Sequence, residues 1–73
     1  MKETVDARGK SCPLPIVLLA RKVRDLQEGS TVCILADDRA FPPDLEAWCK
    51  KTGNELLAMN DRGGFFEAEV KLS

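Results

Sequence analysis

Cys12 is the residue of this chain with the clearest means to do covalent chemistry. It opens a Cys-Pro-Leu-Pro sequence at positions 12–15. Proline is well tolerated in the first turn of a helix, because its missing N–H would have no intrahelical partner there. Cys12 is therefore predicted at or beside a helix N-cap, where the positive helix end lowers the pKa of a thiol. We expect a presented thiol of moderate nucleophilicity, and Arg8 and Lys10 could add to this effect by folding over the sulfur.

A structural interpretation of the cysteines stands beside the chemical one. Free cysteine is among the most buried residue types, so Cys12 could be a small hydrophobe at the start of a helix. Serine, threonine, aspartate and asparagine are better N-caps, and a cysteine here therefore slightly favours function. Cys33 lies in an apolar run and Cys49 on an apolar helix stripe, and core packing is the preferred interpretation of both. The alternative for Cys49 is that it resolves a persulfide on Cys12 or forms a disulfide with Cys12.

The rest of the composition narrows the possible chemistry. The 73 residues include no histidine, which removes Cys-His and Ser-His pairs and most zinc sites. The three cysteines match no zinc or haem spacing, so no metal or other cofactor is expected. Their odd number argues against a disulfide framework and favours a reducing, cytoplasmic setting.

Charge and hydropathy exclude two further classes of function. The net charge is −1, from 11 basic and 12 acidic residues, whereas phosphate binding needs a clustered positive surface. The nearest approach to such a cluster is Arg21, Lys22 and Arg24, which is better interpreted as a solvated helix face. No apolar stretch reaches the roughly 18 residues of a membrane span. The N-terminus lacks the order of basic, then apolar, then small residues that is typical of a signal peptide. We expect neither a direct nucleic-acid partner nor a membrane.

Six short elements are predicted to position the cysteine. Strands are expected at 4–6, 30–36, 55–60 and 65–72, and helices at 13–27 and 42–52. The first helix has one apolar stripe, formed by Ile16, Leu19, Ala20, Val23 and Leu26. Gly29 and Gly53 are placed to adopt the left-handed conformation after each helix. A hairpin is expected at 61–64, where two glycines follow Asp61 and Arg62.

This order predicts a single domain over residues 1–73. The economical fold is an α/β two-layer sandwich of order βαβαββ, with two helices on one face of a mixed four-stranded sheet. The unbroken apolar run at 32–36 indicates a strand that is covered on both faces. In the last strand, apolar residues alternate with Glu67, Glu69 and Lys71, which indicates one core face and one wet face.

The stretch around Cys12 resembles the signature of the TusA/SirA-like sulfur carrier family. The pattern is Asp-x-x-Gly-x-x-Cys-Pro-x-Pro, formed here by Asp6, Gly9, Cys12, Pro13 and Pro15. The resemblance extends over essentially the whole chain. It includes basic residues in the first helix, an acidic pair after the second strand, and an Asp-aliphatic-x-x-aromatic-Cys stretch in the second helix, here Arg21, Lys22, Asp37, Asp38, Asp44, Leu45, Trp48 and Cys49.

The resemblance implies a fold like the C-terminal domain of translation initiation factor three. It also implies that Cys12 accepts sulfane sulfur as a persulfide and relays it to a partner protein. The donors in such a family are a cysteine desulfurase or a rhodanese. The destinations include tRNA thiolation, molybdenum-cofactor maturation and sulfur oxidation, and one branch is linked to selenium. The protein would act as a sulfurtransferase-type carrier rather than as an enzyme with a turnover of its own.

Partner docking is expected beside Cys12, through Arg8, Lys10, Leu14, Arg21 and Lys22. Val17 and Leu18 lie off the main helix stripe and either extend this patch or widen the core face. The alternative to a carrier is a non-catalytic redox-regulatory or interaction module of the same fold. The two hypotheses differ in whether Cys12 holds a transferable sulfur.

Overall fold

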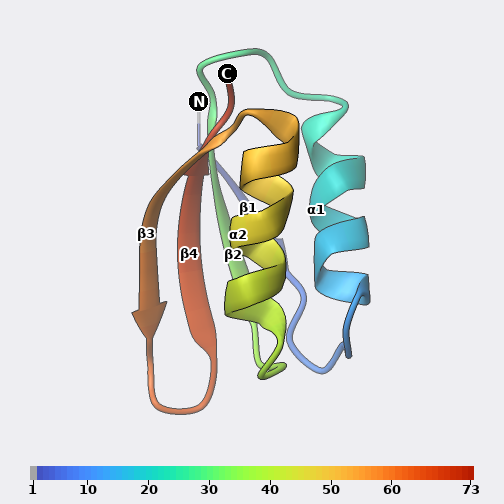
Figure 1. Cartoon of the computed structure of the whole chain (residues 1–73), viewed down its shortest axis with the longest axis vertical. Coiled ribbons are helices and arrows are strands. Elements are labelled where there is room, and N and C mark those ends of the chain that lie inside the picture. The colour runs from blue at the N-terminus through green and yellow to red at the C-terminus, as the bar shows by residue number, and fades with distance from the viewer. Residues whose placement is uncertain (1) are drawn as a thin grey trace.

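The predicted order of elements is confirmed in the computed structural model, which describes residues 2–73 (Figure 1). The elements are β1 (Lys2–Asp6), α1 (Leu14–Val23), β2 (Thr31–Ala36), α2 (Phe41–Thr52), β3 (Glu55–Asp61) and β4 (Phe66–Lys71).

The four strands form one mixed sheet in the order β1-β2-β4-β3. β1 and β2 run parallel, whereas β4 pairs antiparallel with both β2 and β3. Both helices lie on the same face of the sheet (Figure 1). The predicted two-layer α/β sandwich is therefore correct.

The first helix is shorter than its apolar pattern predicts. α1 begins at Leu14, with Pro13 as its N-cap, and ends at Val23 rather than Gln27. The chain then tightens, because the N–H groups of Asp25 and Leu26 donate to carbonyls three residues back, each at 3.1 Å. Leu26 still packs against the core from this turn, so the apolar stripe extends beyond the end of the helix. Gly29 has a φ of +86° but lies in the loop beyond this turn.

The core lies between the helices and one face of the sheet. Leu19 and Leu45 from the helices are fully buried against Val32, Ile34 and their neighbours on β2 and β4. The alternation predicted for β4 holds, since Ala68, Val70 and Leu72 are all buried.

The prediction that β2 is covered on both faces holds at Cys33, although both helices lie on one face of the sheet. Strand side chains alternate between faces, and Val32 and Ile34 point into the helix layer. Cys33 consequently points to the opposite face, where neighbouring strands bury it without a second layer of helices. Its Sγ lies 3.7 Å from Oε2 of Glu67. Cys33 is thus buried, but not in the main core.

Several parts of the chain lie at one end of the molecule (Figure 1). They are the loop from β1 to α1, the loop from β2 to α2, the first turns of both helices and the β3–β4 hairpin. Because β1 and β2 are parallel, both strands deliver the chain to this end. Cys12 lies in the first of these loops.

Candidate functional site

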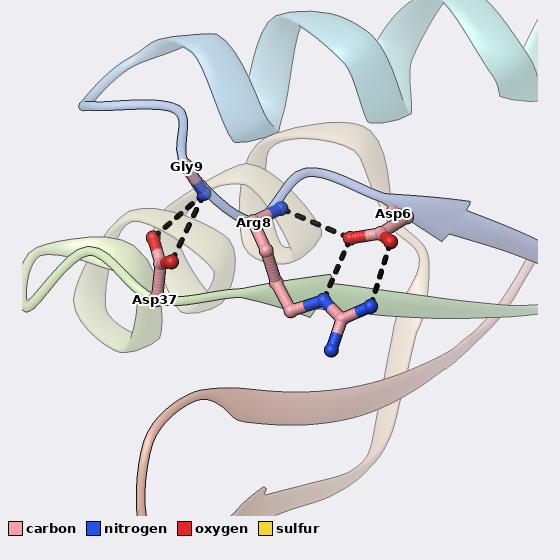
Figure 2. Close-up of polar contacts among 4 residues, drawn as sticks. All are labelled: Asp6, Arg8, Gly9 and Asp37. Atoms are coloured by element: carbon pink, nitrogen blue, oxygen red, sulfur yellow. Dashed lines mark hydrogen bonds and ion pairs between the residues drawn. The ribbon is translucent and has the colours of Figure 1, made fainter.

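The loop that carries Cys12 is held in place by the acidic residues after β2. The pairing of β1 with β2 continues one residue further, since Ala7 N–H donates to the Leu35 carbonyl at 2.7 Å. Gly9 N–H donates to both carboxylate oxygens of Asp37, at 3.1 and 3.0 Å (Figure 2). The Cys12 N–H donates to Oδ2 of Asp38 at 2.8 Å. Two side chains of one loop therefore fix the backbone of the other.

Gly9 supplies the conformation that this arrangement needs. Its φ is +82°, in the left-handed region that side chains other than glycine rarely adopt. A Cβ atom at this position would meet nothing within 4 Å, so the requirement is conformational rather than steric.

Asp6 and Arg8 form a second brace at the start of the loop. Nε and Nη2 of Arg8 donate to the two oxygens of Asp6 at 3.0 and 2.9 Å, and the Arg8 N–H adds a third bond (Figure 2). The guanidinium also lies 5.1 Å from the ring centroid of Phe65, beside the hairpin. Arg8 is thus directed to Asp6 and Phe65 rather than to the sulfur of Cys12.

These bonds make the Asp6 brace sensitive to acid. The hydrogen bonds from Arg8 lower the pKa of Asp6 to about 2. Because the folded pKa is depressed, the stabilisation is complete above the ordinary value of 3.8 and is lost as the pH falls through about 2.

We expect Asp6→Asn to lower the melting temperature by a few degrees above about pH 5, and this difference to shrink as the pH falls toward about 2. Asp25→Asn, at an exposed carboxyl beyond α1, is the matched control and should show little difference at either pH. A constant gap between native and Asp6→Asn melting temperatures across this range would contradict the brace.

Cys12 itself is exposed and lies directly before the N-cap of α1. Its Sγ donates a hydrogen bond to Oδ2 of Asp44 in the first turn of α2, across 2.7 Å. Asp38 faces the same residue through the backbone bond and also accepts the Ala40 N–H at 2.8 Å. Two carboxylates, one from the loop after β2 and one from α2, therefore lie close to Cys12.

This arrangement reverses the pKa shift that the helix position predicts. The hydrogen bond to Asp44 raises the pKa of Cys12, and desolvation and the negative charges of Asp44 and Asp38 act in the same direction. A helix end contributes roughly 0.3–1 kcal/mol at an exposed site, and a carboxylate in direct contact with the sulfur outweighs it. Cys12 is therefore protonated at neutral pH, and the expected lowering is wrong.

The other residues predicted at the site occupy distinct places. Leu14 is 45% exposed and Val17 37% exposed, while Pro15 is buried beneath them. Lys10 and Pro13 are exposed beside Cys12.

The two basic residues of α1 differ in their surroundings. Arg21 is exposed on the same stripe as Leu14 and Val17, seven and four residues further along the helix. Lys22 is engaged with the fold, because its Nζ lies 3.0 Å from Oε1 of Glu3 on β1.

Cys49 lies in the core rather than in the site. It is 4% exposed on α2, and burial raises the pKa of its thiol. It follows Asp44 by five residues, which is roughly 7.5 Å along a helix axis. All three cysteines are free thiols.

Asp37, Asp38 and Asp44 were not predicted to act at the site, although all three belong to the family pattern. Their signal in the sequence is an acidic pair directly after a buried strand and an acidic residue in the first turn of a helix that follows it. Because β1 and β2 are parallel neighbours, the segments that follow them leave the sheet at the same end. The Cys12 loop and these acidic residues therefore lie close together.

Two other kinds of site are not formed by the described part of the chain. Among residues 2–73, no three side chains of the metal-binding types gather closely enough to hold an ion. None of the helices in this range is both long and apolar enough to cross a bilayer.

An exposed free cysteine on a loop held by backbone hydrogen bonds, at one end of a two-layer α/β sandwich, is the main chemical feature of this fold. The family model described as sulfurtransferase TusA matches residues 3–72. The chain therefore belongs to the TusA family, as its signature residues predict.

Named relatives agree with this assignment. A putative sulfur carrier protein of Neisseria meningitidis serogroup A is 38% identical over 69 residues, which is 94% of this chain and 93% of that protein. The sulfur carrier protein TusA of Allochromatium vinosum is 34% identical over 71 residues, covering 97% and 93% of the two chains. The crystal structure of a SirA-like protein from Desulfitobacterium hafniense matches with a TM-score of 0.77 at 25% identity, over 94% and 95% of the chains. These likenesses support a role as a sulfur carrier.

Proposed function

We propose that this protein accepts sulfane sulfur on Cys12 as a persulfide and relays it to an acceptor protein. The observation that carries the proposal is the exposed Cys12 thiol, held by its backbone N–H at the end of the molecule where both helices begin. A relay requires a sulfur that two partners reach in turn, and an exposed thiol on a braced loop meets this requirement.

The donor in this proposal is a protein persulfide, of the kind that a cysteine desulfurase or a rhodanese forms. Cys12 Sγ attacks the outer sulfur of that persulfide, the donor's S–S bond breaks, and the donor cysteine leaves as a thiol. Sulfane sulfur moves between two cysteines, so no external oxidant or reductant takes part. A reducing, cytoplasmic setting belongs to the proposal, because the cysteine must remain a free thiol between cycles.

Docking is proposed along the exposed stripe of α1 that begins beside Cys12. Leu14, Val17 and Arg21 lie on this stripe, and two of them are apolar side chains exposed by more than a third. We place the partner's contact there, with Lys10 and Pro13 at its margin. Arg8 and Lys22 contribute less in this account, because each already pairs with a carboxylate of the fold.

The test of the function is a loading reaction. The native protein, with its thiols reduced and the reductant removed, is incubated with a cysteine desulfurase and cysteine, and its intact mass is measured. We expect a gain of one sulfur atom that a thiol reductant reverses. No gain with either a desulfurase or a rhodanese, while alkylation shows Cys12 to be accessible, would favour a redox-regulatory module instead.

A further inference from the structure

The contact between Asp44 and Cys12 joins two distant parts of the chain at the reacting atom. Oδ2 of Asp44 lies 2.7 Å from Sγ of Cys12, and the two residues are 32 positions apart. Asp44 belongs to the first turn of α2, where its backbone N–H bonds to the Ala40 carbonyl at 3.0 Å. The carboxylate is therefore carried by a helix rather than by a mobile loop.

Asp44 differs from the two other carboxylates at this end of the molecule. Asp37 and Asp38 receive backbone N–H groups, and these bonds hold the Cys12 loop. Among residues 2–73, the Asp44 side chain accepts a hydrogen bond from the sulfur of Cys12. The loop is thus braced independently of Asp44, and the contact of Asp44 bears on the chemistry of the thiol.

We propose that Asp44 is the proton acceptor for Cys12 during sulfur transfer, an inference that rests on the proposed function. As Sγ attacks the outer sulfur of a donor persulfide, the thiol proton moves from Sγ to Oδ2 of Asp44. The new Sγ–S bond forms while the donor's S–S bond breaks. The departing donor thiolate then takes the proton from Asp44, which returns to its carboxylate form.

The charges around Cys12 explain why such an acceptor is needed. The groups that face it are Asp44 of α2 and Asp38 of the preceding loop, and both disfavour a thiolate. On its own loop, the guanidinium of Arg8 is bound to Asp6. A free thiolate is therefore scarce at neutral pH, which slows adventitious oxidation and alkylation. Direct transfer to Asp44 avoids the need for one.

The first arm of the test measures the hydrogen bond without any sulfur donor. The rate of Cys12 alkylation by iodoacetamide is followed against pH for the native protein, Asp44→Asn and Glu46→Gln. Glu46 is exposed two residues further along α2, so its variant controls for the lost charge. We expect the pH midpoint of the alkylation rate to be lower in Asp44→Asn than in the native protein, and to change little in Glu46→Gln. Equal midpoints in all three proteins would overturn the proposal.

The second arm measures loading by a cysteine desulfurase between about pH 6 and about pH 8.5, below the ordinary thiol pKa. The ratio of the Asp44→Asn rate to the Glu46→Gln rate cancels the pH dependence of the donor enzyme. We expect this ratio to fall as the pH falls, by up to about tenfold per unit, because only Asp44→Asn depends on preformed thiolate.

A ratio that stays constant over this range would show that Asp44 does not take the proton. If none of the three proteins is loaded, the proposed function fails and the proton transfer fails with it. A shifted alkylation midpoint in that case would still show the Asp44–Cys12 bond, so the two failures are distinguishable.

Discussion

Replacing Leu19 by alanine is expected to remove much of the stability of this fold. Leu19 is fully buried where α1 packs on the sheet, with 0% of its surface exposed. Leucine-to-alanine changes at such sites cost about 2–5 kcal/mol, through lost apolar burial and the cavity that remains. A domain of 73 residues has roughly 4–11 kcal/mol of stability in total. Urea denaturation monitored by circular dichroism should show a much lower midpoint or no folded baseline.

Leu14→Ala is the matched control for Leu19→Ala, since it makes the same chemical change on the same helix. Leu14 is 45% exposed, and we expect its free energy of unfolding to change by less than about 0.5 kcal/mol. Its proposed role is docking, so the loading rate should fall several-fold while stability is retained. Equal loss of stability in both variants would contradict the placement of the core.

Replacing Cys12 by serine is expected to abolish sulfur loading altogether. A hydroxyl has the shape of a thiol and can still donate to Asp44, but it forms no persulfide. After loading and removal of the donor, cyanide converts sulfane sulfur to thiocyanate, which is measured as its coloured iron complex. We expect up to one thiocyanate for each native protein and none for Cys12→Ser.

Cys49→Ala controls for the general loss of a cysteine. Cys49 lies in the core, so this change should lower the melting temperature and leave the thiocyanate yield unchanged. If the thiocyanate yield disappears in folded Cys49→Ala but persists in Cys12→Ser, the sulfur is carried by Cys49, and our account is contradicted.

Local patterns predicted the fold well because few arrangements bury the apolar residues of so short a chain. The alternation of Ala68 and Val70 with Glu67 and Glu69 correctly indicated a sheet with one wet face. At β2, an apolar run suggested two covered faces, but the helices cover only one of them. On the face away from the helices, Cys33 is buried and its Sγ lies 3.7 Å from Oε2 of Glu67, whereas Leu35 is only half-buried.

The site was predictable in its nucleophile but not in its electrostatics. Two prolines placed Cys12 before a helix, and this depends on residues next to it in sequence. The pKa of the thiol depends instead on Asp38 and Asp44, which are 26 and 32 positions away. Their approach follows from the pairing of β1 with β2, a tertiary feature that neighbouring residues do not report.

The carboxylates give the site two properties that suit a carrier. Asp37 and Asp38 bind backbone groups and so hold the loop in one position. Asp44 contacts the sulfur and keeps it protonated. A thiol that is exposed but protonated reacts slowly with adventitious oxidants and alkylating agents.

Locating the added sulfur within the native protein tests this account most directly. After incubation with a cysteine desulfurase and cysteine, the protein is alkylated, digested and analysed by tandem mass spectrometry. We predict that the extra sulfur appears on the peptide that contains Cys12, while Cys33 and Cys49 carry none. Extra sulfur on Cys33 or Cys49 would contradict this account. The absence of added sulfur from every cysteine of this protein, while the desulfurase was active, would also contradict it.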